Sequence, residues 1–180
     1  MDISKLVSRK ERVKLLEHLL YHASEEIVPN RLAKKVGVSR SQAHKYVNIL
    51  REAGLVEGKR LRETPMLQSI RALLNLGRIE EADASGILKR HFPKMAGWGV
   101  FGSWSTGTNS EGSDLDVWVK LDNEPEDLEI ARAKKEISER LGVPVDIIAA
   151  TPKRLEGFKK KSDSFYFSLY NGKAIWGDGL

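Results

Sequence analysis

The sequence contains no cysteine, which excludes disulfides, thiol nucleophiles and any zinc or iron–sulfur site built on cysteine. No stretch approaches the roughly 18 consecutive apolar residues of a membrane helix, and Met1 to Lys5 lack the apolar run of a signal peptide. The four histidines do not cluster at metal-ligand spacing. We therefore expect a cytoplasmic protein with no membrane partner.

The 180 residues allow one ordinary domain or two small ones, and 41% apolar residues are enough for a packed core. Charge is unevenly distributed along the chain. Residues 1–64 carry 14 Lys and Arg against 8 Asp and Glu, whereas residues 65–180 carry 16 against 17. A basic N-terminal third favours a polyanion partner for that part alone, and an ordinary solvated surface is the alternative.

Two short helices joined by a glycine turn are predicted between Asn30 and Ala53. Gly37 is typical of the end of the first helix, and Ser39 with Gln42 forms a capping box for the second. The second helix ends before Gly54, and a basic hairpin over residues 58–62 follows. A capped second helix after a glycine turn is typical of a helix-turn-helix.

The run from His44 to Val56 resembles the recognition helix and wing entry of winged helix-turn-helix DNA-binding domains, and the resemblance covers residues 10–63. It implies binding to double-stranded DNA, with a protein-docking role as the alternative. In this geometry the start of the helix reaches base edges and the wing contacts phosphates. The candidate DNA-binding residues are Arg40, Ser41, Gln42, His44 and Lys45 on the helix and Arg60 and Arg62 on the wing.

A connector helix is expected to begin at Thr64-Pro65 and to end at Gly77, as a rigid spacer or a homodimer contact. A helix over residues 80–91 follows, and then a buried strand from Gly97 to Phe101. The predicted segments are therefore 1–64, a connector at 65–79, and a second domain at 80–180.

Paired acids follow a Gly-Ser turn at the end of that strand. Gly102 lets the backbone approach a phosphate closely, and Ser103 adds a hydroxyl donor. Asp114 and Asp116 lie two residues apart on the next strand, so both carboxylates face one side. Two adjacent carboxylates repel each other unless a cation lies between them, and hard oxygen ligands beside a phosphate favour Mg²⁺. A polar surface turn with two exposed acids is the alternative. Trp118 shares this face, where packing is favoured over base stacking.

The pattern Gly-Ser-x-x-x-Gly-x-x-x-x-x-Ser-Asp-x-Asp resembles the motif of the minimal nucleotidyltransferases, in the superfamily of DNA polymerase β and the aminoglycoside nucleotidyltransferases. The resemblance covers residues 80–178, and every fixed motif position is matched, by Gly102, Ser103, Gly107, Ser113, Asp114 and Asp116. It implies an enzyme that moves a nucleoside monophosphate from an NTP, with ATP favoured, to an acceptor hydroxyl. The glycines and serines would bind the nucleotide, and the aspartates would hold two Mg²⁺ ions.

The family also requires a third carboxylate on a neighbouring strand. Asp146 is the only acid in the predicted apolar strand 143–149, which follows a helix over residues 125–141. A lone carboxylate there must be paired, and a metal cluster is favoured over a salt bridge. By resemblance Asp146 completes the catalytic and metal-binding set.

One position departs from the family pattern. Antitoxin members often carry Arg before the second motif glycine, where this chain has Thr106. Either another cation, such as Lys120 or Lys153, replaces it, or triphosphate binding is weakened. Two functions follow for this α+β protein with a winged helix and a small mixed sheet. One is a transferase whose acceptor, by the resemblance, is a separately encoded protein; the other is a transcription regulator that senses a nucleotide without catalysis.

Overall fold

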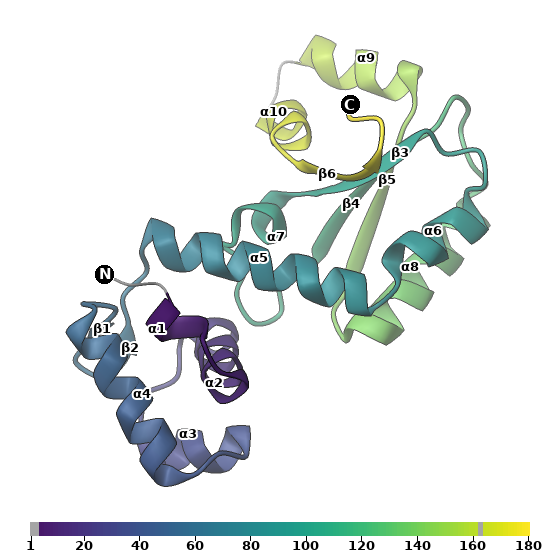
Figure 1. Cartoon of the computed structure of the whole chain (residues 1–180). Helices are drawn as coiled ribbons and strands as arrows, with labels where there is room; N and C mark the ends of the chain where they lie inside the picture. Colours follow the sequence, from purple (N-terminus) through teal and green to yellow (C-terminus); the bar gives the residue numbers. More distant parts are fainter. Residues whose placement is uncertain (1–3, 162–163) are drawn as a thin grey trace. The chain divides into compact units, whose positions relative to one another are not determined.

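The computed structural model describes residues 4–161 and 164–180 (Figure 1). The chain divides into two compact units, Met1–Arg71 and Ala72–Leu180, and the boundary between them along the sequence falls within helix α5 (Pro65–Glu81). In the described residues no helix is both long and apolar enough to cross a membrane.

The first unit is built from four helices and a small hairpin. They are α1 (Ser4–Val7), α2 (Lys10–Tyr21), α3 (Pro29–Val36), α4 (Arg40–Glu52), β1 (Val56–Glu57) and β2 (Arg60–Leu61). Its core includes Leu16, Leu20, Val47 and Leu50, all fully buried. The short helix α1 was not predicted; its Leu6 is buried, and the Leu6 carbonyl accepts from the Tyr46 hydroxyl at 3.2 Å.

The turn before α4 forms as the sequence predicts. Gly37 closes α3 in the left-handed conformation, at φ 72°, which glycine adopts without steric cost. The Gln42 amide donates to Ser39 Oγ at 3.2 Å, and the Ser39 amide donates to Gln42 Oε1 at 2.9 Å. This capping box is confirmed. The Ile27 amide donates to the Lys59 carbonyl at 2.7 Å and so ties the hairpin turn to the α2–α3 loop.

The connector is longer than predicted. Thr64 caps α5 through a bond from the Leu67 amide at 3.3 Å, but Gly77 lies inside the helix, which continues to Glu81. A single exposed glycine costs a helix only about 1 kcal/mol, and burial of Ile79 beyond it offsets that cost. The following helix, α6 (Ala84–His91), therefore begins four residues later than predicted and is capped by Asp83.

The second unit is a four-stranded mixed sheet covered by helices. Its remaining elements are β3 (Gly97–Phe101), α7 (Gly102–Thr106), β4 (Leu115–Lys120), α8 (Asp127–Leu141), β5 (Val145–Ala150), α9 (Pro152–Lys161), α10 (Ser164–Tyr170) and β6 (Lys173–Gly177). The strand order is β5-β4-β3-β6, with β4 parallel to β5 and the other pairs antiparallel. Helix α9 was not predicted.

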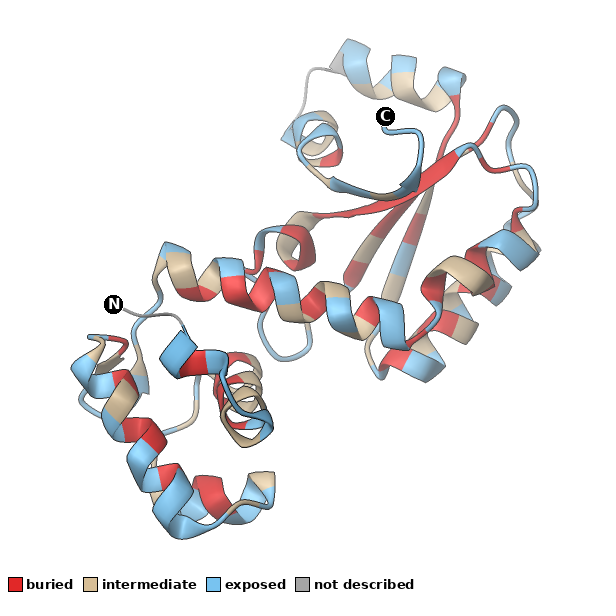
Figure 2. Cartoon of the chain, viewed as in Figure 1, coloured by how far each residue is buried: buried red, intermediate tan, exposed pale blue. Residues whose placement is uncertain are grey.

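Each face of the sheet has its own apolar cluster. Helices α6 and α8 pack on one face, where Ile87, Val117 and Ile137 are buried, and Figure 2 shows β3 buried along its whole length. On the other face Trp118, which is 2% exposed, packs with Phe101 and Leu169 beneath α9 and α10. A side chain at Gly99 would collide with the Trp118 ring, at 2.4 Å. The packing role expected for Trp118 is therefore confirmed.

Candidate functional site

The candidate site lies where β3 ends and turns into α7. Gly102 has φ +64°, a left-handed conformation that side chains rarely adopt. A Cβ atom there would lie 2.3 Å from Asp116 Oδ2, so the backbone of the turn and this carboxylate are in close approach. Glycine is required at this position for both reasons.

The strand register brings the candidate carboxylates to one end of the sheet. Asp116 on β4 is opposite Phe101 on β3 and beside Asp146 on β5, and Asp114 immediately precedes β4. Burial raises the pKa of Asp116, and the negative charges of Asp146 and Asp114 raise it further. The three predicted carboxylates therefore interact electrostatically, as a set that would hold a divalent cation does.

Asp146 does not have the environment that its apolar strand suggested. Its side chain is 53% exposed, because β5 is an edge strand, and its Oδ1 lies 2.5 Å from Nζ of Lys134 on α8. The salt bridge that was the less favoured alternative is therefore present, and the role of Asp146 as a metal ligand stays a prediction. Across residues 4–161 and 164–180 no three His, Asp or Glu side chains form a preassembled metal site.

The segment between the two halves of the motif is held by a buried pair of amides. Asn75 on α5 is fully buried and Asn109 is 2% exposed. Asn75 Nδ2 donates to Asn109 Oδ1 at 2.9 Å and to the Trp104 carbonyl at 2.8 Å. These bonds fix the loop that leads from α7 to Asp114. Neither residue was predicted, because only their polarity within apolar surroundings could have indicated them.

We expect Asn75→Ala to destabilise the protein by about 1–3 kcal/mol, because Asn109 would lose a buried partner and the Trp104 carbonyl a donor. Urea unfolding measures this difference. Asn123→Ala, an exposed amide in the β4–α8 loop, is the matched control and should change stability by less than about 0.5 kcal/mol. Equal stabilities for the two variants would contradict a bracing role for the pair.

The motif serines and Thr106 are placed differently from one another. Ser103 lies in α7, which has only five residues, and Gly107 ends it at φ 73°. Ser113 Oγ accepts from the Ser110 amide at 2.9 Å and so closes the loop. The Thr106 hydroxyl lies 2.9 Å from that of Thr108 and donates to the Gly102 and Ser103 carbonyls, both at 3.2 Å.

The two lysines proposed to replace the missing arginine lie at the wrong end of the sheet. Lys120 pairs with Ala150 in the strand register, about 13 Å along β4 from Asp116. Its Nζ donates to the Gly179 carbonyl at 2.7 Å. Lys153, at the start of α9, follows the same end of β5. Neither lysine is placed beside the carboxylates.

The candidate DNA-binding residues lie on one helix and on the hairpin. Arg40, Ser41, Gln42, His44 and Lys45 occupy the first turns of α4 and are exposed, as are Arg60 on β2 and Arg62 after it. Two of them already have polar contacts. Gln42 takes part in the capping box, and His44 Nε2 lies 3.2 Å from Asn30 Oδ1. Of these side chains, Gln42 is therefore already bound to the start of its own helix.

Residues 82–170 match the family model of the nucleotidyltransferase domain, and this segment contains β3, α7, β4 and β5. The match confirms the resemblance for that part of the chain. No match was found among curated proteins.

Three solved structures are similar to part of the chain. The toxin–antitoxin MntA–HpeT is 21% identical, with 54% of this chain and 73% of that chain covered and a TM-score of 0.43. The tri-AMPylated HEPN toxin of Shewanella oneidensis in complex with MNT antitoxin is 20% identical, with 59% and 73% covered and a TM-score of 0.39. A minimal nucleotidyltransferase is 29% identical, with 50% and 90% covered and a TM-score of 0.37.

Proposed function

We propose that this protein is a Mg²⁺-dependent nucleotidyltransferase with a DNA-binding winged helix. The observation that carries the proposal is the position of Asp116, between the Gly102 turn and Asp146, with its pKa raised by burial and by two neighbouring carboxylates. Such mutual repulsion fits a divalent cation. When bound, two Mg²⁺ ions would supply Lewis-acid stabilisation of the phosphate oxygens.

In the proposed reaction the acceptor oxygen attacks the α-phosphorus of an NTP in line, the bond to the β-phosphate oxygen breaks, and pyrophosphate leaves. Asp114 and Asp116 would hold the metals, and Asp146 would complete the metal-binding set and accept the proton of the acceptor hydroxyl. The Ser103 hydroxyl and the backbone of the Gly102 turn would orient the terminal phosphates. Gly107 and Ser113 would shape the loop that leads into Asp114.

The first unit supports a second activity. An exposed basic helix start and an exposed basic hairpin present Arg40, Lys45, Arg60 and Arg62 to solvent, as a winged helix that binds duplex DNA requires. We propose that this unit represses the gene of the protein itself. A separately encoded protein is the acceptor that the motif resemblance suggests.

Labelled NTPs, Mg²⁺ and host lysate test the transferase. We expect a macromolecule to become labelled by the wild type and not by Asp116→Asn. The amount of pyrophosphate released should equal the amount of label transferred. Labelling that is equal in the two proteins would show that the acids do not catalyse transfer. Protease and nuclease digestion of the product then identifies the class of acceptor.

The second candidate function, nucleotide sensing without transfer, rests on Thr106, whose hydroxyl contacts backbone carbonyls and offers no charge to a triphosphate. We expect NTP affinity to depend almost entirely on Mg²⁺. If no other cation serves the triphosphate, Thr106→Arg should tighten binding by about 1–3 kcal/mol through a charge-assisted bond.

Calorimetric titration of NTP, with Mg²⁺ and with chelator, measures this effect, and Thr108→Arg carries the same charge two residues away as a control. Tighter binding with no pyrophosphate release would favour the sensor, whereas an unchanged or slower transfer would show that a working transferase already has its cation. Tight metal-free binding by the wild type would contradict the proposed phosphate site.

A further inference from the structure

Lys134 is the basic side chain that the structure places against the candidate acids. It lies on α8, and its Nζ is 2.5 Å from Asp146 Oδ1. Helix α8 covers one face of the sheet and Asp146 points to the other. The Lys134 side chain therefore reaches Asp146 around the outer edge of β5. No local pattern in the sequence indicates this contact, since the two residues are 12 positions apart on different elements.

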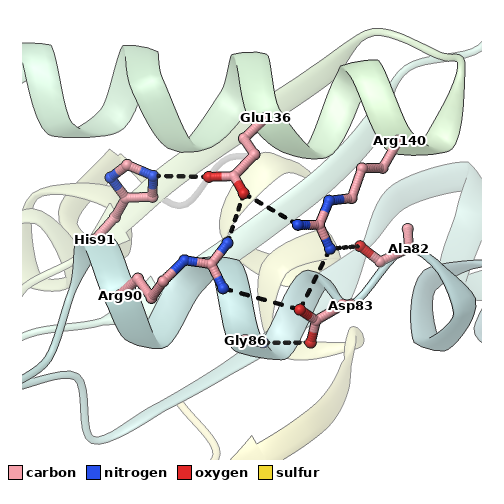
Figure 3. Close-up of polar contacts among 7 residues, drawn as sticks. All are labelled: Ala82, Asp83, Gly86, Arg90, His91, Glu136 and Arg140. Carbon is pink, nitrogen blue, oxygen red and sulfur yellow. Dashed lines mark hydrogen bonds and ion pairs between the residues drawn. The ribbon is translucent and has the colours of Figure 1, made fainter.

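Helix α8 is anchored, so the ammonium group is held near Asp146. Figure 3 shows the polar contacts that join α8 to α6: Glu136 lies 3.2 Å from His91 and 2.5 Å from Arg90, and Arg140 lies 3.3 Å from Asp83. On the inner side of the helix Ala133 and Ile137 are fully buried. At its end the Ser138 hydroxyl donates to the Val143 carbonyl at 2.7 Å, which fixes the path from α8 into β5.

Asp114, Asp116 and Asp146 need a positive charge beside them both when metal is bound and when it is absent. With metal bound, the cation supplies it; without metal, three neighbouring carboxylates repel one another. Lys134 is 34% exposed and Asp146 is 53% exposed, so water weakens their attraction without removing it. An ammonium at this distance from Asp146 also occupies an oxygen that a metal ion would require as a ligand.

We propose that Lys134 is a resident counter-ion that competes with divalent metal for Asp146. In the metal-free protein its ammonium neutralises Asp146 and stabilises the sheet edge. Metal binding displaces the ammonium, so Lys134 sets the metal affinity of the site. This inference rests on the proposed function, because it takes Asp146 as a metal ligand.

Mn²⁺ titration of the full-length protein, followed by calorimetry at fixed ionic strength, tests the inference. Lys134→Met keeps most of the side-chain stem and removes the charge. Lys135→Met is the matched control: it removes the same charge from the next residue, whose side chain is 77% exposed and lies 3.8 Å from Glu139. We expect Lys134→Met to bind Mn²⁺ at least about fivefold more tightly than Lys135→Met. Lys134→Arg should stay near the wild type.

A second readout is the melting temperature. In chelator Lys134→Met should melt below Lys135→Met, and saturating Mn²⁺ should reduce the difference. If Lys134→Met does not fold, Lys134→Gln replaces it in both measurements.

Equal Mn²⁺ affinities for the Lys134 and Lys135 variants would overturn the counter-ion role and leave the metal site in place. Saturable binding that appears only after Lys134 is neutralised would support the role strongly. No binding by any variant would overturn the role, whereas the labelled-NTP assay separately decides whether the protein is a transferase.

Discussion

Replacing Asp116 with Asn is expected to lower nucleotidyl transfer about a thousand-fold or more, which corresponds to roughly 4 kcal/mol of lost transition-state stabilisation. The carboxylate lies between the Gly102 turn and Asp146, so in the proposed mechanism its loss would remove a shared metal ligand from the centre of the site. Asp114→Asn should behave similarly, and Asp146→Asn should lose transfer with a smaller loss of nucleotide affinity. Rates of pyrophosphate release measure all three.

The matched control is Asp122→Asn, which removes an exposed carboxylate beyond the opposite end of β4 and should leave the rate unchanged. Near-wild-type transfer by any two of the three site variants would refute the assignment of the acids.

The Asp116→Asn variant should also be more stable than the wild type when no metal is bound. The pKa of Asp116 is raised above its ordinary value by burial and by its acidic neighbours. A group with a raised folded-state pKa contributes stability below its unfolded pKa, and this contribution is lost as the pH rises through the folded pKa. At neutral pH in chelator, Asp116→Asn should therefore melt above the wild type, and the advantage should shrink as acid protonates Asp116. Circular dichroism melts across this range would show it.

DNA binding is the second result with a large expected effect. If about five basic side chains contact phosphates, affinity for duplex DNA should fall roughly 500-fold for a fourfold rise in salt, because each contact releases condensed counterions. Five basic side chains are exposed there: the candidates Arg40, Lys45, Arg60 and Arg62, and Lys59 in the turn of the hairpin. Fluorescence anisotropy of the full-length protein on labelled duplexes measures the slope.

Removing both Arg60 and Arg62 should weaken binding to all DNA sequences alike. It should also reduce the salt dependence of the affinity by the amount expected for about two phosphate contacts. Lys45→Gln should instead change the preferred sequence, at roughly 1–3 kcal/mol per lost base contact. A double variant of Lys94 and Lys135, exposed lysines of the second unit, controls for net charge. No binding at low salt by the folded protein would favour a protein-docking role.

The local features of the chain were predictable because short-range physics decides them. The Ser39–Gln42 capping box, the left-handed end of α3 at Gly37 and the two-residue spacing of Asp114, just before β4, and Asp116 on it each depend on residues a few positions apart. The Gly-Ser motif with its paired acids likewise predicted a resemblance to nucleotidyltransferases, which the family match at residues 82–170 confirms.

The length of helix α5 was not predicted correctly, because tertiary packing outweighed the local preference of the sequence. Gly77 marks a helix end in the sequence, yet α5 continues to Glu81, since beyond the glycine Ile79 is buried and Arg78 donates to the Leu141 carbonyl at 3.1 Å. Burial and tertiary hydrogen bonds of this kind offset the cost of one glycine.

Tertiary structure alone decided the electrostatics of the candidate site. The sequence by itself determined which carboxylates and which turn are present, because spacing along a strand fixes the face that each side chain takes. It could not show that Asp146 lies at an exposed sheet edge, that Lys134 reaches it from α8, or that Lys120 is at the far end of β4. Those facts depend on strand order and helix placement, which bring together residues that no local pattern relates.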